Sequence, residues 1–187
     1  MQTDKPSRYE LIIAGLGGMG VLAAGRLLAS AAARVYEHIS WVPSYATERR
    51  GGLVECTVVL SHHEIASPIL SRAQTVMLLD SSQLKAFESR VRPKGLVIVE
   101  SASLKDEPGK TNFRLLPVSG LEVAMGIGGI IVNNLILLGV YVELIKPLPP
   151  DLIEEELDRR YGDRDAMLQR NREAFRRGLE LGKTISA

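Results

Sequence analysis

The residues that could do chemistry begin with a glycine-rich segment, Gly15-Leu16-Gly17-Gly18-Met19-Gly20, which fits the pattern G-x-G-x-x-G. Glycines at this spacing allow a tight turn, and the free N–H groups at the start of a following helix can face an anion such as a phosphate. The apolar run 9–14 before the segment predicts a buried strand, and the alanine- and leucine-rich stretch 18–33 predicts a helix. By itself, this arrangement indicates a dinucleotide-binding site.

The second half of a dinucleotide site is missing. Such a site requires an acidic residue about 20 positions further on, at the end of the second strand, to hold the ribose hydroxyls. The predicted second strand, 38–42, ends in Ser40-Trp41-Val42-Pro43 without a carboxylate, and Glu37 precedes it. We therefore expect the glycines Gly15, Gly17, Gly18 and Gly20 to serve strand–helix packing, or to hold only part of a ligand. A stand-alone NAD(P)-binding Rossmann protein stays as the alternative.

The second candidate is the loop 43–52, Pro-Ser-Tyr-Ala-Thr-Glu-Arg-Arg-Gly-Gly, between the predicted strands 38–42 and 53–60. Open α/β sheets keep their ligand sites beyond the carboxyl ends of parallel strands. Arg50 could bind a carboxylate or phosphate through its guanidinium group. Glu48 could instead hold Arg50 in an internal ion pair. Both interpretations stay open beside that of a solvated surface turn.

Three other groups of residues could carry chemistry, and each has a plainer structural interpretation. His62, His63 and Glu64 offer metal-ligand side chains, but adjacent side chains of an extended segment point in opposite directions, which favours a surface hairpin. Asp80 favours a helix cap over a functional carboxylate. Cys56 lies in a valine-rich run and is predicted to be an inert core residue. We therefore expect no metal site and no catalytic residue on this chain.

The composition excludes several classes of partner. With 23 basic and 22 acidic side chains among 187 residues, the net charge is +1, so bulk electrostatics predict no nucleic-acid partner. A single cysteine cannot form an internal disulfide, which favours a reducing, cytoplasmic compartment, and an iron–sulfur cluster needs about four thiolates. A basic face near the C-terminus favours solvation over docking to a partner subunit; it comprises Arg170, Arg172, Arg176 and Arg177.

Apolar runs that alternate with helical stretches predict a Rossmann-like α/β fold with a mostly parallel sheet flanked by helices. The predicted strands are 9–14, 38–42, 53–60, 75–79, 96–99 and 112–117, with a helix at 82–90. We expect a single domain over residues 1–187. Its α/β core spans about 8–146 and a helical appendage about 150–187.

The stretch 123–142 has no charged residue and is long enough to cross a membrane. However, it contains four glycines and the pair Asn133 and Asn134, whose amides are costly in hydrocarbon. We expect one long, buried core helix that ends near Lys146, and no membrane contact. Beyond the prolines that follow, Asp151 and Glu154 resemble a capping box that opens a further helix, and a last helix begins after Asp163.

The glycine segment and the loop 43–52 together resemble the gamma subunits of 2-oxoacid:ferredoxin (or other acceptor) oxidoreductases, which act on pyruvate, ketoisovalerate or 2-oxoglutarate. Members typically carry G-x-G-G-Q-G-V after the first strand and P-S-Y-G-P-E-x-R-G-G further along. This chain keeps the second frame at Pro43, Ser44, Tyr45, Glu48, Arg50, Gly51 and Gly52. Further matches are Ser67-Pro68, the turn from Arg90 to Gly95, and Asn134 with Gly139. The departures are Met19 in place of glutamine, which could remove a hydrogen bond, and Ala46-Thr47 in place of Gly-Pro.

The resemblance implies a subunit of an enzyme that oxidatively decarboxylates a 2-oxoacid, usually to an acyl-CoA. It implies alpha and beta partner subunits, and in some members a ferredoxin-like delta subunit. In the assembled enzyme it implies thiamine diphosphate, Mg, iron–sulfur clusters and CoA, none of them bound by this chain alone. The gamma part resembles a Rossmann domain that packs against the partners and lines part of the active-site or CoA region. A purely structural assembly role stays open, as do the identity of the oxoacid and that of the electron acceptor.

Overall fold

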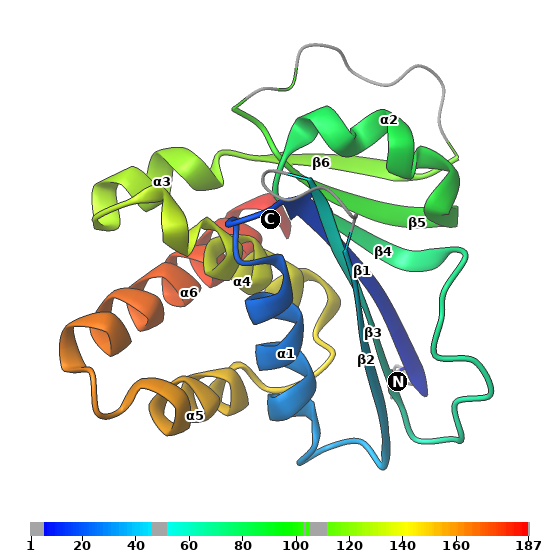
Figure 1. The fold of residues 1–187 in the computed structure, drawn as a ribbon, viewed down its shortest axis with the longest axis horizontal. Coiled ribbons are helices and arrows are strands. Elements are labelled where there is room, and N and C mark those ends of the chain that lie inside the picture. The colour runs from blue at the N-terminus through cyan, green and yellow to red at the C-terminus, as the bar shows by residue number, and fades with distance from the viewer. Residues whose placement is uncertain (1–5, 46–51, 103, 105–111, 187) are drawn as a thin grey trace.

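The computed structural model describes residues 6–45, 52–102, 104 and 112–186, over which strands and helices alternate (Figure 1). The strands are β1 (Arg8–Leu16), β2 (His38–Tyr45), β3 (Leu53–Ser61), β4 (Ala73–Leu78), β5 (Val91–Glu100) and β6 (Arg114–Val118). The helices are α1 (Val21–Ala32), α2 (Leu84–Phe87), α3 (Gly120–Ile127), α4 (Asn133–Ile145), α5 (Pro150–Tyr161) and α6 (Asp165–Ser186). Short 3-10 turns are η1 (Ser81–Gln83), η2 (Glu88–Arg90) and η3 (Ile130–Val132).

The strands form one sheet in the order β2-β3-β1-β4-β5-β6. The pairs β1–β4, β4–β5 and β5–β6 are parallel, whereas β3 is antiparallel to both β1 and β2. Consequently β2 points the same way as β1, and in the described sheet only β3 runs in the opposite direction. The prediction of a mostly parallel sheet flanked by helices is confirmed, with β3 inserted between the first two strands.

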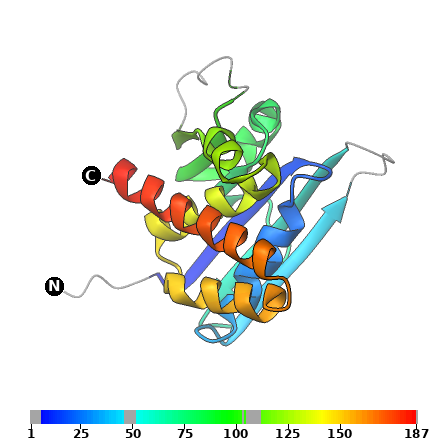
Figure 2. The same cartoon turned by 90° about the vertical axis from the view of Figure 1, so that its left-hand side faces the viewer.

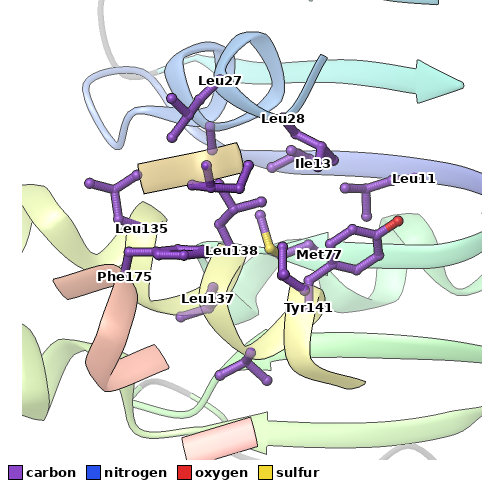
Figure 3. Packing of buried hydrophobic residues seen from close by; sticks show 14 of the residues in the cluster. Leu11, Ile13, Leu27, Leu28, Met77, Leu135, Leu137, Leu138, Tyr141 and Phe175 are labelled. Carbon is purple, nitrogen blue, oxygen red and sulfur yellow. The ribbon is translucent and has the colours of Figure 1, made fainter. Parts of the chain in front are cut away.

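Helices cover both faces of the sheet, and most of them lie on one face. Figure 1 shows α1, α4, α5 and α6 on one side, with α2 on the other. On the face covered by α1, α4, α5 and α6, the strand residues Leu11, Ile13 and Met77 contact helix residues (Figure 3). These helix residues are Leu27 and Leu28 of α1 and Leu138 and Tyr141 of α4. The opposite strand residues, among them Ile12 and Val76, pack with Leu84 and Phe87. The central strands are therefore buried on both faces, as their continuous apolar runs predict.

The two C-terminal helices are part of this core and are not an appendage to it. Ile153 and Leu157 of α5 and Phe175 of α6 are fully buried in the same cluster as α1 and α4. Helices α4 and α6 pack closely because Gly139 and Gly178 face each other: a Cβ at Gly178 would lie 2.1 Å from the Ile136 oxygen. The contact leaves no room for a side chain at these two positions.

Two expectations for the second half of the chain are wrong. The stretch 123–142 is not one helix, because Gly128 (φ 114°) and Gly129 (φ 137°) end α3 and redirect the chain through η3 into α4. Helix α5 has no capping box. Pro149 is its N-cap and Pro150 its first residue, while the Glu154 carboxylate binds Arg176 of α6. Within the described residues, no helix is both long and apolar enough for a membrane span.

Candidate functional site

The glycine segment and the end of the loop 43–52 meet at the carboxyl edge of the sheet. The Gly17 N–H donates to the Gly52 carbonyl oxygen at 3.0 Å. The two segments come together because β3 runs antiparallel beside β1, with Gly15 opposite Val54 and Leu16 opposite Leu53. The sheet order β2-β3-β1 therefore brings the start of β3, rather than the end of β2, next to the glycine segment.

The structure describes only part of the loop 43–52. Pro43 and Ser44 belong to β2, opposite Cys56 and Glu55, and the backbone of Tyr45 pairs with Val54. Glu48, Arg50 and Gly51 lie outside the described residues.

The glycine segment is shaped by backbone conformations that favour glycine. Gly18 has φ 94° and Gly20 has φ 77°, both in the left-handed region. At Gly15 the constraint is space, since a Cβ would lie 3.1 Å from Cβ of Leu79. Met19, which stands where the family typically has glutamine, supplies an acceptor: its Sδ lies 3.4 Å from the Leu16 backbone N–H. Sulfur is a weak acceptor, so this contact closes the turn less firmly than an amide oxygen would.

Asn134 of α4 stabilises the glycine turn through a hydrogen bond to its backbone. Its Nδ2 donates to the Gly20 carbonyl oxygen at 3.1 Å, although more than a hundred residues separate the two in sequence. A Cβ at Gly20 would lie only 2.5 Å from that Nδ2. Gly20 and Asn134 therefore depend on each other, which gives a structural reason for the family match at Asn134.

A buried carboxylate positions the helices that surround the glycine segment. Glu100, at the end of β5, is 2% exposed and accepts hydrogen bonds from the Leu121 N–H at 2.9 Å and from Asn133 Nδ2 at 3.0 Å. It also accepts from the Ala102 N–H at 3.0 Å. Because Leu121 lies in the first turn of α3 and Asn133 begins α4, one side chain fixes the starts of both helices.

An apolar cavity of about 470 Å³ opens beside the glycine segment, against the starts of α3 and α4. It is lined by Gly17, Gly18, Met19, Leu79, Leu121, Ile130, Ile131 and Asn133. Ile130 and Ile131 are 63% and 62% exposed, and Met125 of α3 is 69% exposed. Large apolar side chains gathered at such exposure are typical of a surface that a partner covers.

Among the described residues, the start of β3 beside the glycine segment offers no free carboxylate for a nicotinamide dinucleotide. In a doubly wound dinucleotide fold the second strand lies beside the first and carries the ribose-binding acid at its end. Here β3 takes that place, and its first residues are Leu53 and Val54. Glu55 follows, but its carboxylate is bound by Arg90 at 2.7 Å. The geometry agrees with the interpretation that the glycines serve packing or hold only part of a ligand.

The remaining candidates from the sequence have structural roles. Cys56 is fully buried, and burial raises the pKa of its thiol to about 12. Asp80 caps η1 by accepting from the Ser82 N–H at 2.8 Å, as predicted. His62 follows β3 and packs against the Tyr36 ring, with 4.7 Å between ring centroids. Among the described residues, no cluster of histidine, cysteine, aspartate and glutamate could hold a metal ion.

Two of the four arginines on the basic face of α6 bind carboxylates of α5. Arg172 binds Asp158 at 2.5 Å and Arg176 binds Glu154 at 2.6 Å, while Arg177 pairs with Glu180 on α6 itself. These bonds hold the pKa of Glu154 below its ordinary value, chiefly through the hydrogen bond from Arg176. The predicted solvated face therefore also has a structural role, because Arg172 and Arg176 join α6 to α5.

Two features of the site were not predicted from the sequence. The exposure of Ile130 and Ile131 was not predicted, because both residues lie in a long apolar stretch that was expected to be one buried helix. The Gly128-Gly129 pair beside them is the sequence signal for a break in that helix. Arg160, Arg170 and Asn171 line a cavity with the glycine segment, and no sequence spacing indicates that α5 and α6 return to it.

Comparisons with known proteins agree with the resemblance seen in the sequence. The chain is 32% identical to ketoisovalerate oxidoreductase subunit VorA of Methanothermobacter marburgensis over 172 residues, which are 91% of this chain and 36% of VorA. It therefore spans little more than a third of that relative. It is 29% identical to 2-oxoglutarate synthase subunit KorC of Archaeoglobus fulgidus over 181 residues, 97% of this chain and 91% of KorC.

A solved structure shows the same fold. The keto/oxoacid ferredoxin oxidoreductase gamma subunit from Geobacter sulfurreducens superposes with a TM-score of 0.80 at 24% identity, covering 94% of this chain and 99% of that one. The family model described as pyruvate ferredoxin/flavodoxin oxidoreductase matches residues 10–181, which include the glycine segment, the loop 43–52 and all six strands from within β1 onward. The chain belongs to the pyruvate ferredoxin/flavodoxin oxidoreductase family.

Proposed function

We propose that this chain is the gamma subunit, or gamma domain, of a 2-oxoacid:acceptor oxidoreductase that oxidatively decarboxylates a 2-oxoacid, usually to an acyl-CoA. The observation that carries the proposal is the hydrogen bond from the Gly17 N–H to the Gly52 oxygen. It joins the two segments on which the family resemblance rests into one surface at the carboxyl edge of the sheet. A shared surface is what two separate motifs need in order to serve one reaction centre.

The reactive groups belong to partner chains in this proposal. The sole cysteine, Cys56, is buried and has a raised thiol pKa, so it does not fit a cluster ligand or a nucleophile. The donor groups of the described residues do not fit a metal ion either. Thiamine diphosphate, Mg, iron–sulfur clusters and CoA are therefore assigned to the assembled enzyme, with alpha and beta subunits and, where present, a ferredoxin-like delta subunit. A free, buried thiol fits a cytoplasmic setting.

The exposed apolar side chains mark where a partner subunit would dock. Met125, Ile130 and Ile131 lie around the break between α3 and α4, and Ile130 and Ile131 line the cavity beside the glycine segment. An interface there would cover the apolar cavity and bring a partner to the edge where the two motifs meet. Apolar anchors of this kind carry most of the affinity at protein interfaces.

The docking test is co-expression of this chain with the alpha- and beta-type chains of its own genome, followed by size-exclusion chromatography. We expect Ile131→Asp to weaken the complex roughly tenfold or more, because it places a charge in an apolar interface. The matched control is Ile69→Asp. Ile69 is 71% exposed, on the connection between β3 and β4 at the opposite side of the molecule in Figure 1. Equal binding by both variants would remove this surface from the proposal.

The role of the loop 43–52 is tested by Arg50→Ala in the complex. If the loop serves the reaction, assembly survives while turnover falls or the KM for CoA or for the oxoacid rises, since an anion contact is lost. Arg49→Ala, the adjacent arginine outside the family frame, is the matched control. If Arg50→Ala leaves assembly and turnover unchanged, the loop is only surface. If assembly alone is lost, the loop is structural.

A further inference from the structure

A second cavity lies on the other side of the glycine segment, where α1, α4, α5 and α6 converge; Figure 2 shows α5 and α6 across the front of this region. Its volume is about 270 Å³. Its polar lining consists of Arg160 and Tyr161 of α5, Arg170 and Asn171 of α6, and Asn134 of α4, with Gly18 and Gly20 at the glycine segment. We call it the arginine pocket. Two guanidinium groups and no carboxylate line it, so its field is positive.

Asn171 is a mostly buried residue whose amide has no protein partner. The residue is 8% exposed, and within the described residues its amide makes no hydrogen bond to protein. Its amide atoms are not fully closed off from solvent, so they can bind water or a ligand at the surface of the pocket. Asn171 lines the arginine pocket, so a molecule bound there would supply the missing partner.

Arg170 shows the same deficit. Its Nε is buried without a hydrogen-bond partner, and in the described part of the chain it is the one arginine of α6 that no carboxylate neutralises. Arg160 contacts Glu156 only at 3.4 Å, whereas Arg159 holds that carboxylate at 2.6 Å. Both guanidinium groups of the arginine pocket therefore retain donors for a ligand.

The start of α1 adds to the same field. Gly20 caps this helix without a side-chain acceptor, and its first turn carries no acidic residue. The N–H groups of the first turn thus keep the partial positive charge of a helix N-terminus. Gly18, Gly20 and Ala23 place this end of α1 in the wall of the arginine pocket.

We propose that the arginine pocket binds a phosphate group, held by Arg170, Asn171 and the start of α1. Guanidinium, amide and helix N–H donors match the acceptor oxygens of a phosphate. The cavity is smaller than the roughly 300–1,000 Å³ of sites that enclose a whole drug-sized ligand. It therefore suits inorganic phosphate, pyrophosphate, or the phosphates of a nucleotide whose remainder lies outside. The site goes beyond the proposed function, because it lies on this chain alone and needs no partner subunit.

The test is calorimetric titration of the full chain with inorganic pyrophosphate and, separately, with adenosine 5′-diphosphate at fixed ionic strength. We expect saturable binding that Arg170→Met weakens roughly tenfold or more, and Asn171→Ala about two- to tenfold. Arg177→Met is the control: it removes the same charge two turns further along α6, where Arg177 pairs with Glu180 at 3.0 Å. Tighter binding of the nucleotide supports a nucleotide as the source of the phosphate. Equal or tighter binding of pyrophosphate supports a free anion.

Thermal unfolding separates loss of a ligand from loss of the fold. Arg170→Met removes a buried, unpartnered donor, so its unfolding midpoint should equal or exceed that of the unaltered chain without ligand. Asn171→Ala provides a second variant should Arg170→Met not fold. The proposal is overturned if the unaltered chain shows no saturable binding, or if the folded variants at 170 and 171 bind as tightly as Arg177→Met. These outcomes do not depend on assembly, so they leave the proposed function to its own tests.

Discussion

At the scale of single residues, Gly20 is held by two constraints at once. Its φ of 77° lies in the left-handed region, and the Asn134 amide occupies the place of a Cβ. Gly18 shares only the first constraint, because nothing lies within 4 Å of its Cβ position. The two glycines therefore form a matched pair in which backbone strain and steric contact can be separated.

We predict that Gly18→Ala lowers the free energy of unfolding by about 1–2 kcal/mol, the ordinary cost of a left-handed alanine. Gly20→Ala should cost about 1–3 kcal/mol more, because it also displaces Asn134 from the Gly20 oxygen. Urea unfolding of the two variants measures the difference. Equal losses would mean that Asn134 does not hold the glycine segment.

Cys56 provides a prediction about pH. Desolvation raises the pKa of its thiol from 9.0 to about 12, so the folded chain binds this proton more tightly than the unfolded chain does. The contribution of the protonated Cys56 thiol to the free energy of unfolding should therefore be fully present below about pH 9 and be lost as the pH rises toward 12. Cys56→Ser should flatten that part of the stability curve, measured by urea unfolding at several alkaline pH values. A steep fall that the variant retains in full would assign the effect to other groups.

The structural roles of single residues could be predicted from the sequence where neighbouring residues determine them. The Asp80 cap and the buried Cys56 both follow from their immediate neighbours in the chain. The Asn134–Gly20 hydrogen bond was not predictable from spacing, because it depends on how α4 packs against α1. The same holds for Glu100, whose buried carboxylate joins elements that the sequence leaves unrelated.

At the scale of elements, the break between α3 and α4 shapes both cavities. Gly129, with φ 137° and ψ 155°, has a backbone conformation almost restricted to glycine, and it directs Ile130 and Ile131 outward. Gly126, three residues earlier in α3, lies in open space without a positive φ. It is the natural control for a substitution in the same segment.

We predict that Gly129→Ala lowers the free energy of unfolding by about 1–3 kcal/mol, because alanine is strained in that conformation. Gly126→Ala should leave it unchanged or raise it by up to about 1 kcal/mol, since alanine favours the helix. Thermal and urea unfolding of both variants provide the measurement. A Gly129→Ala variant as stable as the Gly126→Ala variant would show that α3 and α4 tolerate a continuous helix.

Element positions were predictable because each strand is a short apolar run between turn residues. All six predicted strands are present, within a few residues of their expected bounds, from β1 to β6. Two expectations were wrong for other reasons. One long helix was expected from apolar character alone, although glycines break the chain after α3. A helical appendage was expected because hydrophobic periodicity does not encode the close contact at Gly139 and Gly178, which packs α6 against α4 in the core.

At the scale of the whole molecule, the order of the strands bears on the alternative function. The sequence predicted the strands but not that β3 would separate β1 from β2, because long-range pairing is not visible in local pattern. With β3 in that place, an acidic residue for a ribose is missing from the described edge beside β1. We predict no saturable micromolar binding of NAD(H) or NADP(H) to the purified chain by calorimetry. Binding of NAD(H) or NADP(H) that is tighter than the binding of adenosine 5′-diphosphate would favour a stand-alone dinucleotide-binding protein.

The most direct measurement is reconstitution of 2-oxoacid-dependent acceptor reduction from co-expressed alpha- and beta-type chains, with and without this chain. Pyruvate, 2-oxoisovalerate and 2-oxoglutarate would be tested in turn, with CoA and a viologen acceptor. A gamma subunit is predicted to co-elute with the partners and to be required for full turnover with at least one of the three oxoacids. Elution of this chain as a lone monomer, together with full oxoacid oxidation by the remaining subunits, would contradict the proposed function.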